Sequence, residues 1–207
     1  MRALGILGGT FNPPHLGHLA VARSARDELA LDRVMLMPVH TPPHKAPEVE
    51  PGAQRRLRMC RLLTDGEQGI QACGLEVERG GSSYTVDTLI GLHDIYPEAE
   101  LTFIVGADTA RTLPSWREPE LVLSLARLAV ASRGSAEQGE VRAAVASVSP
   151  QARPLFLEMP PIEISSSLAR ERAEHGEPLE ELVGDAVAAY VSDHGLYGEA
   201  GAGEGLW

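Results

Sequence analysis

The chain has 207 residues, 43% hydrophobic and 4% aromatic, with 18 basic and 29 acidic residues and a formal net charge of −11. This composition predicts one folded domain with a sizeable core, and the charge opposes general adhesion to nucleic acids or anionic membranes. No apolar run approaches the roughly 20 residues that cross a bilayer, and the first residues turn to Gly, Asn and Pro too early for a signal peptide, so we expect a soluble, cytoplasmic protein.

Short hydrophobic runs alternate with helical patterns through the first half of the chain. Strands are predicted at 2–9, 33–39 and, weakly, 69–79. Helices are predicted at 16–30 and 53–63, the second of them basic and amphipathic. A proline-dense loop at 40–52 separates the second strand from the second helix. This alternation is typical of βαβ units.

The second half repeats the same alternation. Strands are predicted at 100–108, 127–133 and 154–160, and helices at 83–97, 134–147, 165–176 and 180–197. We therefore predict an α/β fold with a doubly wound parallel sheet, as one domain over 1–197 with C-terminal helices and a flexible tail at 198–207. Ligands of such folds bind beyond the carboxyl ends of the strands, where the winding reverses.

The stretch GILGGTFNPPHLGHLAVARSA, residues 5–25, combines features of an anion site. Gly8 and Gly9 follow a strand and are expected to let the backbone turn sharply, leaving room for an anion near main-chain N–H groups. The next helix points its positive end at the same place, and His15 and His18 share a face of its first turn. We predict a cradle for phosphate. A metal site is not predicted, because no third ligand stands at a recognisable spacing.

Two motifs connect this stretch to a known superfamily. GGTFNPPHLGH resembles the signature of the H-x-G-H nucleotidyltransferases, and ISSSLAR at 164–170 resembles their partner motif, usually I-S-S-T-x-x-R. More narrowly, PVHTPPHK, SSYTVDTL, FIVGADTARTLPSW and ASRG are similar, in the same order, to segments of bacterial nicotinate-nucleotide adenylyltransferases. The resemblance runs from Leu4 to about Tyr197, with Ser167 where threonine is usual and Gly184 where proline is usual.

This resemblance implies a Rossmann-like nucleotidyltransferase fold and an activity in NAD biosynthesis. The implied reaction transfers AMP from ATP to nicotinate mononucleotide and gives deamido-NAD and pyrophosphate. Mg²⁺ is implied as a companion of ATP, without a dedicated cage of protein ligands. The implied partners are ATP and the mononucleotide, with no nucleic acid and no membrane, and a homo-oligomer is left open.

The resemblance also implies roles for individual residues. His15 and His18 are the implied catalytic residues, which hold the triphosphate and stabilise charge on the reacting phosphorus. The implied ATP-binding residues are Gly8, Gly9, Thr10, Phe11, Gly106, Asp108, Arg133, Ile164, Ser165, Ser166 and Arg170. The implied residues for the mononucleotide are Lys45, Tyr84, Thr85 and Trp116, with the tryptophan stacked on the pyridine ring.

Several of these roles have a structural alternative. Asp108, Thr85 and Ser165 can each be an N-cap of a helix. The cations Lys45, Arg133 and Arg170 can be solvated or ion-paired at the surface, and Trp116 can be core packing. Cys60 and Cys73 lack a CxxC spacing and are interpreted as mostly buried thiols.

Two alternatives remain for the function as a whole. The chain can be a related nucleotidyltransferase with another phosphorylated acceptor, such as nicotinamide mononucleotide or phosphopantetheine. It can also be a catalytically idle sensor that binds nucleotide on the same fold. The second alternative would be favoured by loss of either histidine or of Arg170, and all three are present.

Overall fold

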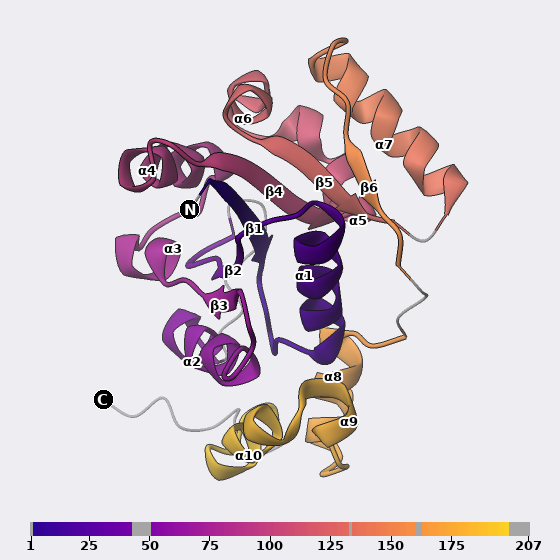
Figure 1. Ribbon diagram of the computed structural model, residues 1–207. Helices are drawn as coiled ribbons and strands as arrows, with labels where there is room; N and C mark the ends of the chain where they lie inside the picture. The colour runs from indigo at the N-terminus through magenta and orange to yellow at the C-terminus, as the bar shows by residue number, and fades with distance from the viewer. Residues whose placement is uncertain (1, 43–50, 133, 160–162, 199–207) are drawn as a thin grey trace.

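The computed structural model describes residues 2–42, 51–132, 134–159 and 163–198 (Figure 1). Within these ranges six parallel strands form one sheet in the order β3-β2-β1-β4-β5-β6. The strands are β1 (Ala3–Gly9), β2 (Arg33–Pro38), β3 (Ile70–Ala72), β4 (Glu100–Gly106), β5 (Arg127–Ala131) and β6 (Leu155–Leu157). The winding reverses between β1 and β4, which confirms the predicted doubly wound α/β fold.

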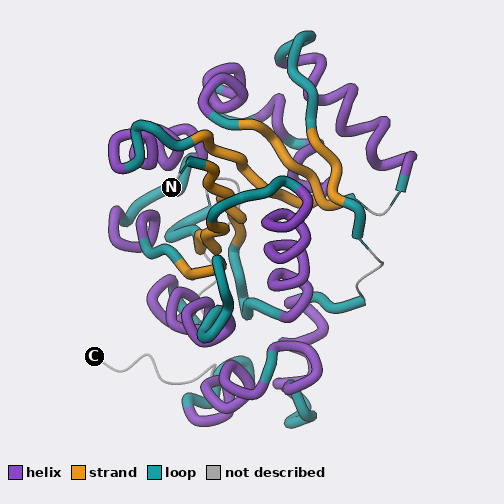
Figure 2. Tube along the Cα trace, viewed as in Figure 1, coloured by secondary structure: helices purple, strands orange, loops and turns teal. Residues whose placement is uncertain are grey.

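Helices cover both faces of this sheet, as Figures 1 and 2 show from the same side. In chain order they are α1 (Leu16–Glu28), α2 (Ala53–Leu63), α3 (Leu75–Arg79), α4 (Thr85–Ile95), α5 (Ala107–Arg111), the 3₁₀ turn η1 (Leu113–Ser115), α6 (Pro119–Leu125), α7 (Ser135–Val148), α8 (Ser166–Glu174), α9 (Glu180–Val183) and α10 (Asp185–Asp193). The last three gather at one end of the molecule, beyond α1. No helix in the described ranges is long and apolar enough to span a membrane.

Two hydrophobic cores lie on opposite faces of the sheet, because successive side chains of a strand point to opposite sides. On β1, Leu4 and Ile6 pack into the core formed with α4 to α7, whereas Leu7 packs into the core formed with α1, α2 and the C-terminal helices. On β4, Phe103 and Ile104 divide in the same way. The apolar runs that predicted these strands therefore reflect burial on both faces.

The prediction of a strand at 69–79 is wrong in its second half. The strand β3 ends at Ala72, and the helix α3 begins after Gly74. A Cβ atom on Gly74 would lie 3.0 Å from the Leu57 side chain and 2.6 Å from Glu78 Oε1, so this glycine lets α3 approach α2 closely. Tertiary packing overrides the alternating pattern of this segment.

Two other predictions need correction or stay open. The predicted helix at 180–197 is divided at Gly184, whose φ of 79° ends α9 before α10 begins. The division of the chain at 197 stays a prediction, since residues 199–207 lie outside the described ranges.

Both cysteines are free thiols. Cys60 is fully buried and Cys73 is half-buried, and burial raises the pKa of each thiol above its ordinary value. A raised pKa keeps the unreactive thiol form at neutral pH. The interpretation as mostly buried thiols agrees with this placement.

Candidate active site

Three adjoining pockets lie at the carboxyl ends of β1 and β4, where the winding of the sheet reverses. The arginine pocket, about 470 Å³, includes Arg56 and Arg170; the glycine pocket, about 390 Å³, includes Gly106; the tryptophan pocket, about 460 Å³, includes Trp116. His18 lines both the arginine and the glycine pockets, and Thr10 lines both the arginine and the tryptophan pockets. The pockets therefore form one continuous site.

The two histidines lie together at the start of α1. His15 is its N-cap, and the two imidazole rings stack with centroids 3.7 Å apart and planes 30° apart. The backbone N–H of His15 donates to Nδ1 of His18 over 3.2 Å. Because that nitrogen accepts, the neutral His18 ring carries its proton on Nε2. The edge of the Phe11 ring contacts His18, with centroids 4.7 Å apart.

Burial keeps both imidazoles neutral. Desolvation lowers the pKa of His15 to about 4 and the pKa of His18 well below its ordinary value, and the adjacent His15 lowers the pKa of His18 further. At neutral pH the pair therefore offers hydrogen-bond donors rather than two full positive charges. An anion bound beside them would favour the charged forms and raise both pKa values.

Gly8 and Gly9 act differently from the prediction. Both lie within β1 and neither has a positive φ, so a sharp turn at these glycines is wrong. A Cβ atom on Gly8 would lie 2.8 Å from the Phe103 ring, and one on Gly9 would lie 3.2 Å from the Phe11 ring. The glycines let two aromatic rings pack against the end of the strand. The chain turns at Phe11, whose φ is 53°.

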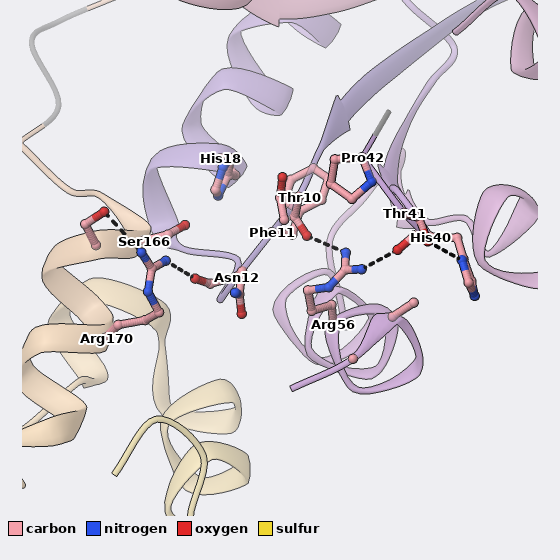
Figure 3. A pocket seen from close by; sticks show the side chains of 13 residues that line it. Thr10, Phe11, Asn12, His18, His40, Thr41, Pro42, Arg56, Ser166 and Arg170 are labelled. Atoms are coloured by element: carbon pink, nitrogen blue, oxygen red, sulfur yellow. Dashed lines mark hydrogen bonds between the residues drawn. The ribbon is translucent and has the colours of Figure 1, made fainter. Parts of the chain in front are cut away.

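The arginine pocket is built around the loop that carries Phe11 (Figure 3). From α8, Arg170 donates to the carbonyl oxygen of Asn12 over 2.7 Å, and Ser166 donates to that of Pro13 over 2.8 Å. On the other side of the loop, Arg56 of α2 donates to the carbonyl oxygen of Thr10 over 2.7 Å. The structure thus places the predicted Thr10, Ser166 and Arg170 in one pocket.

Arg56 is a site residue that sequence reasoning missed. It is only 6% exposed, and it also donates to the carbonyl oxygen of His40 over 3.0 Å. A signal was present, because Arg56 stands at helical spacing with Met59, Cys60 and Leu63 on the buried face of α2. A charged residue on an apolar face indicates a specific partner.

Asn12 is a second missed residue, although it stands inside the quoted motif. It is buried, and its side-chain oxygen accepts a hydrogen bond from the Tyr197 hydroxyl over 2.5 Å. Tyr197 lies 185 positions further along the chain and has a φ of 64°, an uncommon conformation for a non-glycine residue. No local pattern of the sequence signals such a contact.

The glycine pocket brings together His15, His18, Gly106, Asp108 and Ile164, all of which were predicted. Asp108 stands in the first turn of α5, just past the end of β4, with a side chain that is 92% exposed. Its carboxylate pairs with Arg111. The N-cap of α5 is Gly106, so the alternative role of Asp108 as an N-cap is wrong.

The tryptophan pocket has an aromatic wall. The half-buried Trp116 packs edge-on against Phe103, with centroids 5.9 Å apart, and its Nε1–H donates to Thr112 Oγ1 over 2.9 Å. Tyr84 also lines the pocket, and the guanidinium of Arg117 lies 5.0 Å from the centre of its ring. Such a wall suits a flat ring that carries polar groups at its edge.

The remaining predicted residues divide into three cases. Thr85 lines the tryptophan pocket as the first residue of α4, and the N-cap is Tyr84, so the N-cap role of Thr85 is wrong. Ser165 lines none of the three pockets and caps α8, where its hydroxyl accepts from the N–H of Leu168 over 3.1 Å. Lys45 and Arg133 lie outside the described residues.

Among the described residues, no group of three or more His, Cys, Asp or Glu side chains could hold a metal ion. Mg²⁺ is commonly bound through substrate phosphates and one or two carboxylates, and it usually keeps several of its waters.

Comparison with known proteins places the chain in a family. Residues 6–172 match the cytidylyltransferase-like family model. A probable nicotinate-nucleotide adenylyltransferase of Desulfitobacterium hafniense strain DCB-2 is 38% identical, with 95% of this chain and 96% of the relative covered, and one of Roseiflexus sp. strain RS-1 is 41% identical, with 94% and 97% covered.

Solved structures agree at the level of the fold. The nicotinic acid mononucleotide adenylyltransferase of Plasmodium falciparum, complexed with NaAD, superposes with a TM-score of 0.75 at 18% identity and covers 95% of this chain and 98% of that one. The relatives that share more than a third of their residues over nearly the whole length decide the assignment. The chain belongs to the cytidylyltransferase-like family and, within it, to the nicotinate-nucleotide adenylyltransferases.

Proposed function

We propose that this protein transfers the adenylyl group of ATP to nicotinate mononucleotide, which gives deamido-NAD and pyrophosphate in NAD biosynthesis. The observation that carries the proposal is the continuity of the three pockets around His18 and Thr10. A two-substrate transfer needs both substrates to meet at one phosphorus atom. The family membership supplies the identity of the two substrates.

We assign the glycine pocket to the nucleoside of ATP and the tryptophan pocket to the pyridine ring of the acceptor. Asp108, which lines both pockets, can accept hydrogen bonds from ribose hydroxyls. Trp116 offers its indole face to the flat ring. The phosphates would then lie between the two pockets, near Gly8, Gly9 and the start of α1, where helix N–H groups favour anions.

The chemistry requires no intermediate on the protein. An oxygen of the acceptor phosphate attacks the α-phosphorus of ATP and forms a new P–O bond. The bond from that phosphorus to the bridging oxygen of the β-phosphate breaks, and pyrophosphate leaves with the electron pair. The attacking oxygen is already anionic, so the protein need not remove a proton, and catalysis consists of positioning and charge stabilisation.

His15 and His18 act on the charge that develops in this step. Both are neutral in the free protein, and His18 carries its proton on Nε2, so it can donate to a phosphate oxygen. Arg170 adds positive charge from the arginine pocket. Mg²⁺ bound to the phosphates would neutralise part of their charge.

The test is pyrophosphate release by the purified protein with ATP, Mg²⁺ and nicotinate mononucleotide. Parallel reactions replace the acceptor by nicotinamide mononucleotide or phosphopantetheine. We expect release with nicotinate mononucleotide and none with phosphopantetheine. Calorimetry measures binding in the same samples. Binding of ATP without turnover of any acceptor would contradict the proposal and favour a nucleotide sensor.

A further inference from the structure

The tryptophan pocket contains a buried acidic residue that the reaction above does not use. Glu76 of α3 is 5% exposed and contributes to the pocket wall. Its Oε1 accepts a hydrogen bond from the Thr88 hydroxyl over 2.6 Å, whereas its Oε2 has no hydrogen-bond partner among the described residues. A carboxyl group with an unpartnered oxygen is costly to bury. A functional role for Glu76 would explain why the protein tolerates this cost.

The surroundings of Glu76 show which part of the pocket it supports. Thr88, its hydrogen-bond donor, lies on α4, and the Ser83 side chain interacts with the same carboxyl group. Tyr84 and Thr85, which line the pocket, stand between these two residues in the chain. One carboxyl group therefore contacts both ends of the segment that forms this wall.

The same cluster reaches the loop after β2. Ser83 Oγ accepts from the backbone N–H of His40 over 2.9 Å, and the Ser83 N–H donates to the carbonyl oxygen of Thr41 over 2.9 Å. On the other side, Arg79 donates to Thr88 Oγ1 over 3.1 Å. Glu76 thus lies where α3, α4 and the loop after β2 meet.

We propose that Glu76 is a positioning residue that sets the affinity of the tryptophan pocket for the ring of the acceptor. It does so by holding the segment 83–88 in its binding conformation before the acceptor arrives, which lowers the entropy lost on binding. This inference rests on the proposed function, because it takes the tryptophan pocket as the acceptor site. ATP, bound in the glycine pocket, should be insensitive to it.

Glu76 acts through hydrogen bonds rather than through charge. Burial raises the pKa of Glu76, and the hydrogen bond from Thr88, the interaction with Ser83 and the charge of Arg79 oppose that rise. Glutamine keeps the shape and an acceptor oxygen for Thr88, but it has no ionised form. Glu76→Gln therefore separates the two kinds of action.

The experiment measures KM for nicotinate mononucleotide, KM for ATP and kcat. For Glu76→Ala we expect KM for the mononucleotide to rise about tenfold, while KM for ATP and kcat stay within about twofold, because the lost interaction serves acceptor binding. Glu76→Gln should restore KM to within about threefold of the wild type. Glu78→Ala and Glu78→Gln are the matched controls on the same helix, since the Glu78 side chain is 69% exposed.

A second pair of variants covers the case in which Glu76→Ala does not fold. Thr88→Val removes the hydroxyl that donates to Glu76, whereas Thr88→Ser keeps it. Only Thr88→Val should raise KM for the mononucleotide, by several-fold. Thermal unfolding of every variant checks that the fold is kept.

Three results would overturn the inference. The first is an equal rise in KM for both substrates. The second is no rise in Glu76→Ala. The third is a Glu76→Gln variant that changes the ratio of kcat/KM between nicotinate and nicotinamide mononucleotide, whose rings differ by one charge; charge would then be the cause. An inactive wild type would overturn the proposed function and this inference together, whereas an active wild type with no selective effect in Glu76→Ala would overturn this inference alone.

Discussion

The loop from Thr10 to His18 and the wall of the tryptophan pocket are built in different ways. The loop is held through its main chain, by Arg56, Ser166 and Arg170, and its imidazoles, one buried and one half-buried, are neutral. The wall of the tryptophan pocket includes the half-buried aromatic side chains of Tyr84 and Trp116. Reaction at phosphorus depends on hydrogen-bond donors that are held in fixed positions. The affinity for the pyridine ring, in contrast, increases with the area of contact between the ring and the pocket. Substitutions in the loop should therefore lower kcat, and substitutions in the wall should raise KM for the mononucleotide.

The largest effect is expected for His18→Ala. Loss of one donor to a developing charge typically costs about 10²–10³ in rate, so kcat should fall by that factor while KM for the mononucleotide changes little. Steady-state kinetics measures both constants, and circular dichroism checks the fold. A His18→Ala variant with wild-type kcat would remove the histidine from the catalytic assignment.

Acid should destabilise the loop through His15. Its pKa falls from 6.5 in the unfolded chain to about 4 in the folded protein, so the unfolded state binds protons first as the pH drops. The contribution of neutral His15 to stability is fully present above pH 6.5 and is lost as the pH falls toward 4. The total loss in the free energy of unfolding is about 3 kcal/mol.

Urea unfolding across this pH range measures that loss, in a buffer without phosphate because a bound anion would raise the pKa. His15→Asn cannot titrate and should lack this part of the pH dependence. An identical pH dependence in the two proteins would show that His15 is not responsible.

Substitution of Trp116 in the wall of the tryptophan pocket should have a more moderate effect. In Trp116→Ala, KM for nicotinate mononucleotide should rise about tenfold and KM for ATP should stay within about twofold, because an aromatic contact contributes roughly 0.5–1.5 kcal/mol beyond its buried area. Trp116→Phe, which keeps a flat ring, should recover most of the loss. Equal effects on the two KM values would count against a separate ring pocket.

The smallest effect is expected for Tyr197→Phe. This change removes only the hydroxyl that donates to Asn12, so kcat should fall by at most about fivefold, in line with the roughly 1 kcal/mol of one neutral hydrogen bond. Tyr190→Phe, on α10, is the matched control. If only KM for the mononucleotide changed, this contact would serve acceptor binding rather than the loop, which would contradict the prediction.

The sequence predicted the fold well because its strands are buried on both faces. The prediction of a strand at 100–108 agrees with β4, which covers Glu100–Gly106 and is mostly buried. The second half of 69–79 could not be predicted as a helix, because α3 depends on close contact with α2 rather than on its own sequence pattern. Short elements carry weak periodicity, and their type is decided by tertiary packing.

The site was predictable where it coincides with local motifs. His15, His18, Ser166 and Arg170 stand in the two quoted strings, and the structure brings them to one place. The turn at Phe11 was not predictable, because a left-handed φ on a bulky residue has no compositional signal. Glu76 was missed for a related reason, since its hydrogen-bond donor Thr88 lies on another helix, twelve positions further along the chain.

The contact between Tyr197 and Asn12 has a consequence for synthesis of the protein. All six described strands precede α8 in the chain, so during synthesis they leave the ribosome before Ser166, Arg170 and Tyr197 do. The loop that faces the nucleotide would lack these three anchors at that stage. Catalytic competence would therefore arise last, once the C-terminal helices have packed against the core that they share with α1 and α2.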